Sequence, residues 1–332
     1  MTIEFRRIAA ALFLLGLGYP THLAYKYYQR CTYLPIRYPH ISANGFRHTA
    51  DHFFDQPHKI KILLTGKSFS PDAVKNGDTI FIKNHPQYLT KFFANVHPYI
   101  NEKYILISHQ GDMTTPGAYA HHLDSEKIIA WYSCNVGADA HPKMRPIPLG
   151  VMGILMKNLP RNCEEILGRV LLDIKKGAIN KTNLFYFNVN PKTNILERGK
   201  PLDFLRNQKF CTMAKSKPYE QYLREMATHK FVISPHGTGL DCYRTWEALT
   251  LGCIPVVKKS SLDVLYEGLP VLIVDNWQEV TEDFLEIKYQ EMQQQQYQLE
   301  RLSIGYWIDV IRRHRDSLSR EQENQAIQKI QN

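Results

Sequence analysis

Short apolar runs alternate with amphipathic segments along most of this chain, and the alternation predicts an α/β fold. The apolar runs predict buried strands at 59–65, 78–82, 103–108, 127–132, 183–189, 231–233, 254–257 and 271–274. Helical patterns lie among them at 88–96, 164–176, 219–228, 242–251, 262–266 and 281–287. We therefore expect parallel strands joined and covered by helices.

The most informative stretch is 231–257, FVISPHGTGLDCYRTWEALTLGCIPVV, which reads as strand, glycine loop, helix and strand. Asp241 is a good N-cap residue for the helix, and Gly252 lies where a glycine commonly ends one. This arrangement is half of a doubly wound sheet. The loop between the first strand and the helix is therefore the expected binding position.

The residue types in this stretch suit a diphosphate. A helix N-terminus offers free N–H groups and partial positive charge, and Gly237 and Gly239 let the backbone approach a ligand. Arg244 in the first turn can add a charge-assisted contact, and Glu247 can accept hydrogen bonds from ribose or sugar hydroxyls. The alternative is that Arg244 and Glu247 only pair with each other as an i,i+3 salt bridge.

Three further residues join the predicted donor-binding set. His236 and Thr238 belong to the glycine loop, where His236 could contact the diphosphate or the transferred sugar. Arg198 follows the strand at 183–189 and could reach a donor phosphate. For His236 the alternative is a structural role, and for Arg198 it is an exposed position on a loop.

The glycine-loop stretch resembles the nucleotide-sugar half of exostosin-like glycosyltransferases. The matching residues are Gly237, Gly239, Arg244, Trp246-Glu247-Ala248-Leu249 and Gly252-Cys253-Ile254-Pro255-Val256-Val257. The stretches YILISHQGD, IIAWYSCNV and HPKMRPIPLGV also resemble the N-terminal half of that family. The resemblance implies the GT-B fold, in which two Rossmann-like domains face each other across a cleft and the C-terminal domain binds the donor nucleotide.

On this basis the chain divides into five parts. We expect a short hydrophobic helix at 1–25, a stem at 26–58, an N-terminal Rossmann-like acceptor domain at 59–180, a C-terminal Rossmann-like nucleotide-sugar domain at 181–290, and closing helices with a tail at 291–332.

Asp112 is the preferred catalytic base, with His109 second. Both follow the strand at 103–108, at the edge of a parallel sheet where ligands bind. A carboxylate or imidazole of the N-terminal domain that faces the cleft would suit an inverting single displacement. The alternatives are that Asp112 caps a turn and that His109 is a hydrogen-bonded core residue.

Metal binding is not expected. The chain has no Asp-x-Asp and no Cys-x-x-Cys motif, and its six cysteines are widely spread. His121 and His122 are adjacent, so their side chains diverge on a regular element. We expect protein groups, not a metal or another cofactor, to neutralise the diphosphate.

The chain has 332 residues, a formal charge of +9 and a sequence pI of about 9.1. This balance fits anionic partners, either sugar nucleotides or a membrane surface. No recognised nucleic-acid motif is present, so nucleic acid is not an expected partner.

Arg6 and Arg7 precede an apolar run at 8–19. They predict a signal-anchor and a single-pass membrane protein, with a Golgi-type lumenal domain in a eukaryote or a membrane-associated domain in a bacterium. A cleaved signal and an amphipathic or buried soluble helix are the alternatives.

Taken with the resemblance, these features predict a glycosyltransferase. It would move a sugar from a nucleoside-diphosphate sugar, by analogy a UDP-sugar, to the hydroxyl of a glycan, glycoprotein or other acceptor, with inversion and without metal. The alternatives are a non-catalytic GT-B-like binding protein and a GT-B transferase that uses a GDP-sugar.

Overall fold

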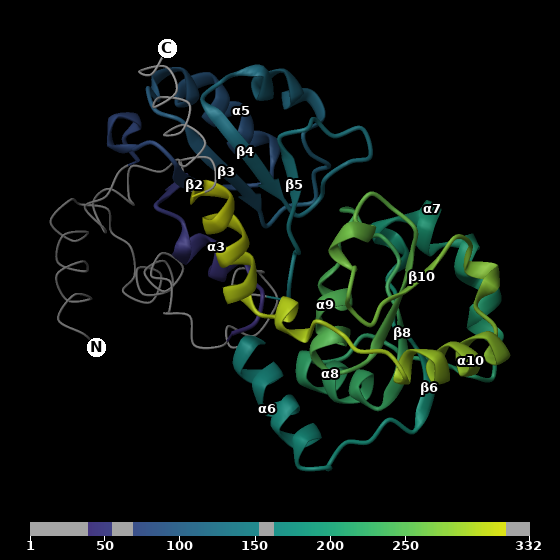
Figure 1. The fold of residues 1–332 in the computed structure, drawn as a ribbon. Coiled ribbons are helices and arrows are strands. Elements are labelled where there is room, and N and C mark those ends of the chain that lie inside the picture. The colour runs from purple at the N-terminus through teal and green to yellow at the C-terminus, as the bar shows by residue number, and fades with distance from the viewer. Residues whose placement is uncertain (1–38, 55–68, 153–162, 317–332) are drawn as a thin grey trace, which may run out of the picture.

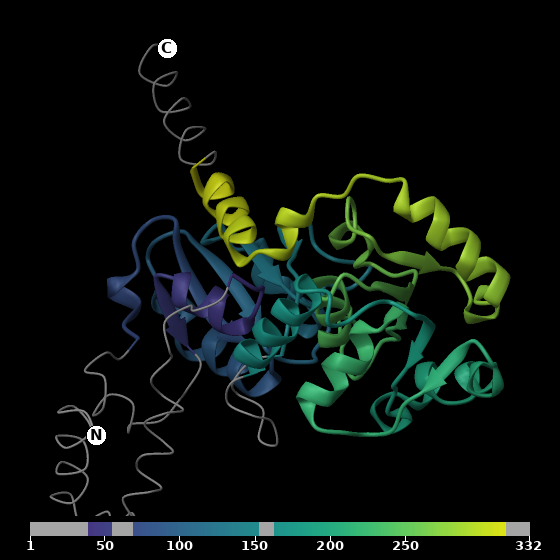
Figure 2. The same cartoon turned by 90° about the horizontal axis from the view of Figure 1, so that it is seen from below.

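The computed structural model describes residues 39–54, 69–152 and 163–316, and it contains two five-stranded sheets. The first has the order β1-β2-β3-β4-β5 and the second the order β10-β9-β8-β6-β7, and all neighbouring strands are parallel. Figures 1 and 2 show the sheets in two separate lobes, called here the N-half and the C-half. The expected α/β fold with two Rossmann-like halves is confirmed.

The strands of the N-half are β1 (His52–Phe54), β2 (Asp78–Lys83), β3 (Tyr104–His109), β4 (Ile128–Ser133) and β5 (Met144–Pro146). Those of the C-half are β6 (Asn183–Phe187), β7 (Cys211–Met213), β8 (His229–Ile233), β9 (Ile254–Lys258) and β10 (Leu272–Val274). The α-helices with assigned bounds are α3 (Ala43–Thr49), α5 (Pro86–Asn95), α6 (Cys163–Lys175), α7 (Ile195–Arg198), α8 (Tyr219–Ala227), α9 (Tyr243–Thr250) and α10 (Glu282–Gln293). Residues 304–316 are also helical.

Short 3-10 helices complete the described elements. They are Pro71–Ala73, His97–Tyr99, Gly117–Asp124, Pro191–Thr193, Lys200–Asn207, Asp263–Leu265, Trp277–Glu279 and Leu299–Leu302.

The beginning of the described chain belongs to the N-half. The segment 39–54, predicted as part of a stem, forms α3 and β1, and β1 pairs with β2 in the first sheet. The expected strand at 59–65 and the expected N-terminal anchor lie outside the described residues. Among the helices that the structure describes, none is long and apolar enough to cross a bilayer.

Alternating side chains of each strand enter different parts of the core, as the period of a β-strand requires. Phe81 belongs to a cluster that runs through both halves, whereas Ile80 and Ile82 belong to a second cluster confined to the N-half. A third cluster, including Phe231, fills the other side of the C-half. The shared cluster, to which Trp246 belongs, joins the halves by buried apolar contact.

The C-terminal helix at 304–316 returns to the N-half, where Figure 1 shows it beside α3. Its first residue touches that half directly, since Ile304 N–H donates to the carbonyl of Pro39 (2.8 Å). Near its end, the hydroxyl of Tyr132 and Nδ1 of His314 are 2.7 Å apart. The C-terminal helix thus contacts the N-half both at its first residue and near its last described turn.

Candidate active site

A cavity of about 440 Å³ lies between the two halves. Asp112 and Leu149 line it from the N-half, and Lys217, Gly239 and Arg244 line it from the C-half. These residues follow the carboxyl ends of parallel strands or begin the next helix, the position at which such sheets bind ligands. The cavity is therefore the candidate active site.

Arg244 occupies the first turn of α9 and has a buried Nε with no hydrogen-bond partner. Its side chain lines the cavity, and among the described residues its charge acts on Glu247 electrostatically without a close ion pair. A close salt bridge with Glu247, the alternative to a binding role, is not formed there. A charged guanidinium with free donors at a helix N-terminus is suited to an anion.

Glu247 lies one turn further along α9 and is 1% exposed. Its Oε1 accepts a hydrogen bond from Tyr219 (2.9 Å) and its Oε2 accepts one from Tyr222 (3.0 Å). Burial raises the pKa of Glu247, while the two hydroxyls, Arg244 and the backbone N–H of Met152 favour its charged form. The carboxylate that was expected to meet ribose is thus already engaged by protein donors.

Arg198 is 6% exposed and braces the glycine loop from behind. Its Nε donates to the carbonyl of His236 (2.7 Å), and one terminal nitrogen donates to the carbonyl of Pro235 (2.8 Å). The other donates to Thr193 Oγ1 (2.7 Å). Arg198 reaches the cavity wall, but these contacts make it a support of the loop instead of a free phosphate ligand.

The remaining loop residues divide between the two sides of the loop. Gly237 and Thr238 line the cavity together with Gly239. His236 is absent from the lining, and Glu197, Lys258, Arg198 and Asp263 are its charged neighbours. The structure therefore places His236 away from the position expected for a ligand contact.

The two candidate bases have different surroundings. Asp112 is exposed and lines the cavity. His109 is fully buried, its Nδ1 accepts the N–H of Gln110 (2.8 Å), and its Nε2 lies 3.0 Å from the carbonyl of Pro148. Both ring nitrogens are occupied in the core, so His109 does not suit the role of base and Asp112 alone keeps it.

Asp241 is not the N-cap of α9, which is Cys242. Instead its buried carboxylate accepts hydrogen bonds from the backbone N–H of Leu149 (2.7 Å) and from the indole N–H of Trp246 (2.8 Å). Burial raises the pKa of Asp241 to about 7, against the effect of these N–H donors. Because Leu149 belongs to the N-half, Asp241 connects the halves beside the cavity.

Sequence reasoning did not find four residues of this site. Lys217 adds a second cation to the cavity wall and is itself held by the carboxylate of Glu225. Tyr219 and Tyr222 hold Glu247, and Asn135 holds two loops together. Tyr219 lies in the predicted helix at 219–228, and only the placement of that helix against α9 reveals its partner.

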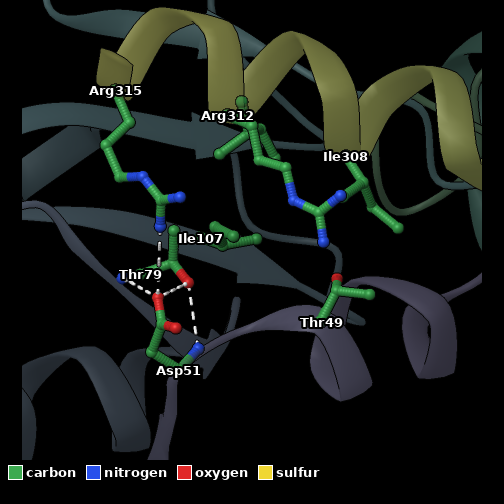
Figure 3. Close-up of a pocket in the computed structure, with 8 residues that line it drawn as sticks. Thr49, Asp51, Thr79, Ile107, Ile308, Arg312 and Arg315 are labelled. Carbon is green, nitrogen blue, oxygen red and sulfur yellow. Dashed lines mark hydrogen bonds and ion pairs between the residues drawn. The ribbon is translucent and has the colours of Figure 1, made fainter.

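A smaller cavity of about 130 Å³ lies between the C-terminal helix and the N-half (Figure 3). Arg312 and Arg315 extend from the helix toward Thr49 and Asp51, as Figure 3 shows. The carboxylate of Asp51 already accepts hydrogen bonds from the N–H (2.9 Å) and hydroxyl (2.8 Å) of Thr79. None of the predicted site residues lines this cavity, so we assign it to the packing of the helix.

Within the described segments, no group of three or more His, Cys, Asp and Glu side chains is arranged to hold a metal ion. His121 and His122 form a ring contact with centroids 4.0 Å apart, and His122 stacks on Phe93 at the same distance. The pair thus takes part in an aromatic cluster of the N-half.

Residues 203–320 match the family described as the RXYLT1 C-terminal domain. The matched segment contains the glycine loop, α9 and the helix at 304–316. The match confirms the predicted relationship to exostosin-like glycosyltransferases, and the chain carries a glycosyltransferase domain. A comparison with curated proteins finds no match.

Solved structures with a similar chain course include the UDP-forming α,α-trehalose-phosphate synthase of Burkholderia vietnamiensis. That match has a TM-score of 0.41 and 9% sequence identity, and it covers 83% of this chain and 80% of that chain. The α,α-trehalose 6-phosphate synthase of Burkholderia multivorans gives a TM-score of 0.42 at 9% identity, over 84% of this chain and 77% of that chain. The fold assignment itself rests on the two parallel sheets.

Proposed function

We propose that this glycosyltransferase moves a sugar from a nucleoside-diphosphate sugar, with a UDP-sugar as the expected donor, to the hydroxyl of a glycan or other acceptor. The observation that carries the proposal is Arg244, which lines the cavity between the halves and whose Nε has no hydrogen-bond partner. Lys217 and the loop backbone at Gly237 and Gly239 line the same cavity. The N–H of Gly237 is already donated to the carbonyl of Gly239 (3.0 Å), so the groups offered to a diphosphate are the two cations and the N–H groups at the start of α9.

Displacement requires a stabilised leaving group and a deprotonated acceptor. In our proposal Arg244, Lys217 and the N-terminus of α9 stabilise the leaving diphosphate. Asp112, on the opposite wall, takes the proton of the acceptor hydroxyl. One base and one displacement would invert the anomeric centre, and the cations would do the work that a metal does in other transferases.

Binding of nucleotides tests the donor site first. The set is UDP, GDP, CMP and ADP, each with and without EDTA, measured by calorimetry. We expect one diphosphate to bind regardless of EDTA and Arg244→Ala to weaken it roughly 10- to 100-fold, the range for hydrogen bonds to a charged group. Arg312→Ala, on an exposed arginine that does not line this cavity, is the matched control.

Failure of every nucleotide to bind would contradict the donor site and favour the non-catalytic binding protein. Binding of GDP alone would favour the GDP-sugar alternative. If UDP binds, turnover of UDP-sugars, including UDP-xylose and UDP-hexoses, distinguishes pentosyl from hexosyl transfer. Asp112→Asn should then lower the rate of sugar transfer by ~10²–10⁴-fold, the range for loss of a general base, while the affinity for UDP stays unchanged.

We also propose that the segment 1–25 anchors the protein in a membrane. The support is the pair Arg6-Arg7 before the apolar run at 8–19. Expression of the full chain and of residues 39–332, followed by carbonate extraction of membranes, tests this. Retention of both chains in the same fraction would overturn the proposal.

A further inference from the structure

Asn135 is the second residue after the end of β4, and it lies between the loop that bears Asp112 and the glycine loop of the C-half. It is 1% exposed. Its Nδ2 donates to the carbonyl of Gly111 (2.8 Å), and its Oδ1 accepts the backbone N–H of Asp241 (2.9 Å). One side-chain amide therefore joins the two loops that carry the proposed base and the proposed donor site.

The orientation of this amide is determined by its partners. Its oxygen faces an N–H donor and its nitrogen faces a carbonyl acceptor, so a flipped amide would lose both hydrogen bonds. A carboxylate at this position could accept from Asp241 but would face the oxygen of Gly111. An alanine would leave a buried donor and a buried acceptor without partners.

The backbone of Asn135 contacts Thr115, which lies beyond Asp112 in the turn that begins at Gly111. Its carbonyl accepts the N–H (2.8 Å) and the hydroxyl (3.2 Å) of Thr115. Asp112 thus lies between two points, Gly111 and Thr115, that are both attached to Asn135. Asn84 holds the same turn at Met113, whose carbonyl accepts a hydrogen bond from its Nδ2 (2.6 Å), but of these two residues only Asn135 also contacts the glycine loop.

The two loops are also in direct contact. A Cβ added at Gly239 would lie 3.0 Å from Nδ2 of Asn135 and 3.2 Å from the Cα of Asp112. Glycine at 239 therefore permits the close approach that the amide then holds. The sequence predicted that this glycine lets the backbone approach a ligand. In the structure the backbone at Gly239 approaches Asn135 and Asp112 of the N-half.

We propose that Asn135 is a positioning residue that holds the Asp112 turn at a fixed place against the donor loop. The inference rests on the proposed function, in which Asp112 is the base and the glycine loop holds the donor diphosphate. Its consequence is kinetic, because misplacement of a reacting group by about 1 Å can cost ~10²-fold in rate. Asn135 itself does not line the cavity.

A double-mutant cycle between Asn135→Ala and Asp112→Asn tests the inference. The probes are UDP binding by calorimetry and release of UDP from UDP-xylose, with water as acceptor. We expect Asn135→Ala to lower the rate of UDP release ~10- to 100-fold in the wild-type background. In the Asp112→Asn background it should have little further effect, because residues that act through one another are not additive. The affinity for UDP should change by less than about 3-fold, since Arg198 and Arg244 remain in place.

Asn135→Asp, which keeps the acceptor toward Asp241, is the second variant if the alanine protein does not fold. Ser261→Ala is the matched control: its hydroxyl donates to the carbonyl of Val136 (2.6 Å), so the substitution removes a contact between the halves beside Asn135 but leaves both hydrogen bonds of the Asn135 amide. Its rate should equal that of the wild type at equal folded fraction. Additive effects of Asn135 and Asp112, or an equal loss in Ser261→Ala, would overturn the inference. Failure of the wild type to bind any of the four nucleotides would instead reject the proposed function.

Discussion

At the scale of single residues, Glu247 differs most from its predicted role. The sequence predicts a contact with ribose or sugar hydroxyls, but the side chain is buried against protein donors. Its two carboxylate oxygens are held by Tyr219 and Tyr222, and the charge of Arg244 favours its ionised form. A ribose hydroxyl would replace a hydrogen bond that the buried carboxylate already makes with a tyrosine, so binding to ribose would add no hydrogen bond. We infer that Glu247 supports Arg244 and the packing of α8 against α9.

Glu247→Gln tests this role. Because the amide offers N–H groups where a carboxylate accepted hydrogen bonds, one tyrosine hydroxyl loses its acceptor, at a cost of about 1–3 kcal/mol in the free energy of unfolding. The affinity for UDP should change by less than about 3-fold. Thermal unfolding and calorimetry measure the two effects, and a large loss of UDP affinity with an unchanged melting temperature would restore the ribose contact.

His109 gives a prediction for pH. Burial lowers the pKa of His109 to about 4, against an ordinary value of 6.5, so the folded state resists protonation. The stability that it contributes is full above pH 6.5 and is lost as pH falls from 6.5 toward 4. At about 1.4 kcal/mol per pKa unit, the loss approaches about 3 kcal/mol.

Denaturant titrations at several pH values between 4 and 7.5 measure this loss. His109→Gln should flatten the dependence, because no group at this position then titrates. His121→Gln, on an exposed histidine of the same half, is the control and should keep the wild-type slope. An unchanged slope in His109→Gln would show that other groups cause the acid instability.

At the scale of elements, the glycine loop offers a chemical probe of the site. Of the five cysteines in the described residues, Cys242 alone is partly exposed, and it lines the cavity. Burial raises the pKa of its thiol, which also donates to the carbonyl of Pro235. Alkylation of the native protein should therefore modify Cys242 before the other four, slowly at pH 7 and faster at pH 9.

Saturating UDP should protect Cys242 from iodoacetamide, as measured by mass spectrometry of tryptic peptides. Cys211, buried on the far side of the C-half core, serves as the internal reference. If UDP binds by calorimetry but leaves the labelling rate of Cys242 unchanged, the nucleotide occupies another place.

Strands made of an apolar run could be read from the sequence, including the three-residue β10 (Leu272–Val274), whereas short strands without such a run could not. The runs at 103–108 and 127–132 became β3 and β4 with bounds shifted by one residue. The three-residue strands β1, β5 and β7 show too little periodicity to be recognised. Their pairing with longer neighbours, not their own sequence, makes them strands.

The sequence predicted those site residues that lie close together along the chain. Arg244 and the loop glycines stand within one strand-loop-helix unit, and the structure places them on the cavity. Asn135 and Asp241 are 106 positions apart, and no local pattern links them. The contacts of Arg198 and Glu247 were missed for the same reason, since burial depends on how α7, α8 and α9 meet.

At the scale of the whole molecule, one core cluster runs through both halves. Its members include Phe81 of the N-half, Trp246 of α9 and Trp307 of the C-terminal helix. Halves that share a core cannot unfold independently without exposing apolar surface of the other. We therefore expect one cooperative transition in spite of the two sheets.

Coincident unfolding curves from far-UV circular dichroism and tryptophan fluorescence would confirm this expectation. The probes cover both halves, since Trp131 lies in β4 and Trp277 in the C-half. Asp241→Ala should lower the midpoint of the single transition, because Leu149 and Trp246 lose a shared acceptor. Two separated transitions in the wild type would contradict the shared core.

The return of residues 304–316 to the N-half has a consequence for biosynthesis. Because protein chains leave the ribosome N-terminus first, the N-half must wait for almost the entire chain before its surface beside α3 is covered. A premature stop before residue 304 therefore leaves both halves present but removes Ile308 and Ile311, which lie beside Ile107 of the N-half. Such a truncated product would be recognised by chaperones and proteases as unfinished, although its entire donor loop had been translated.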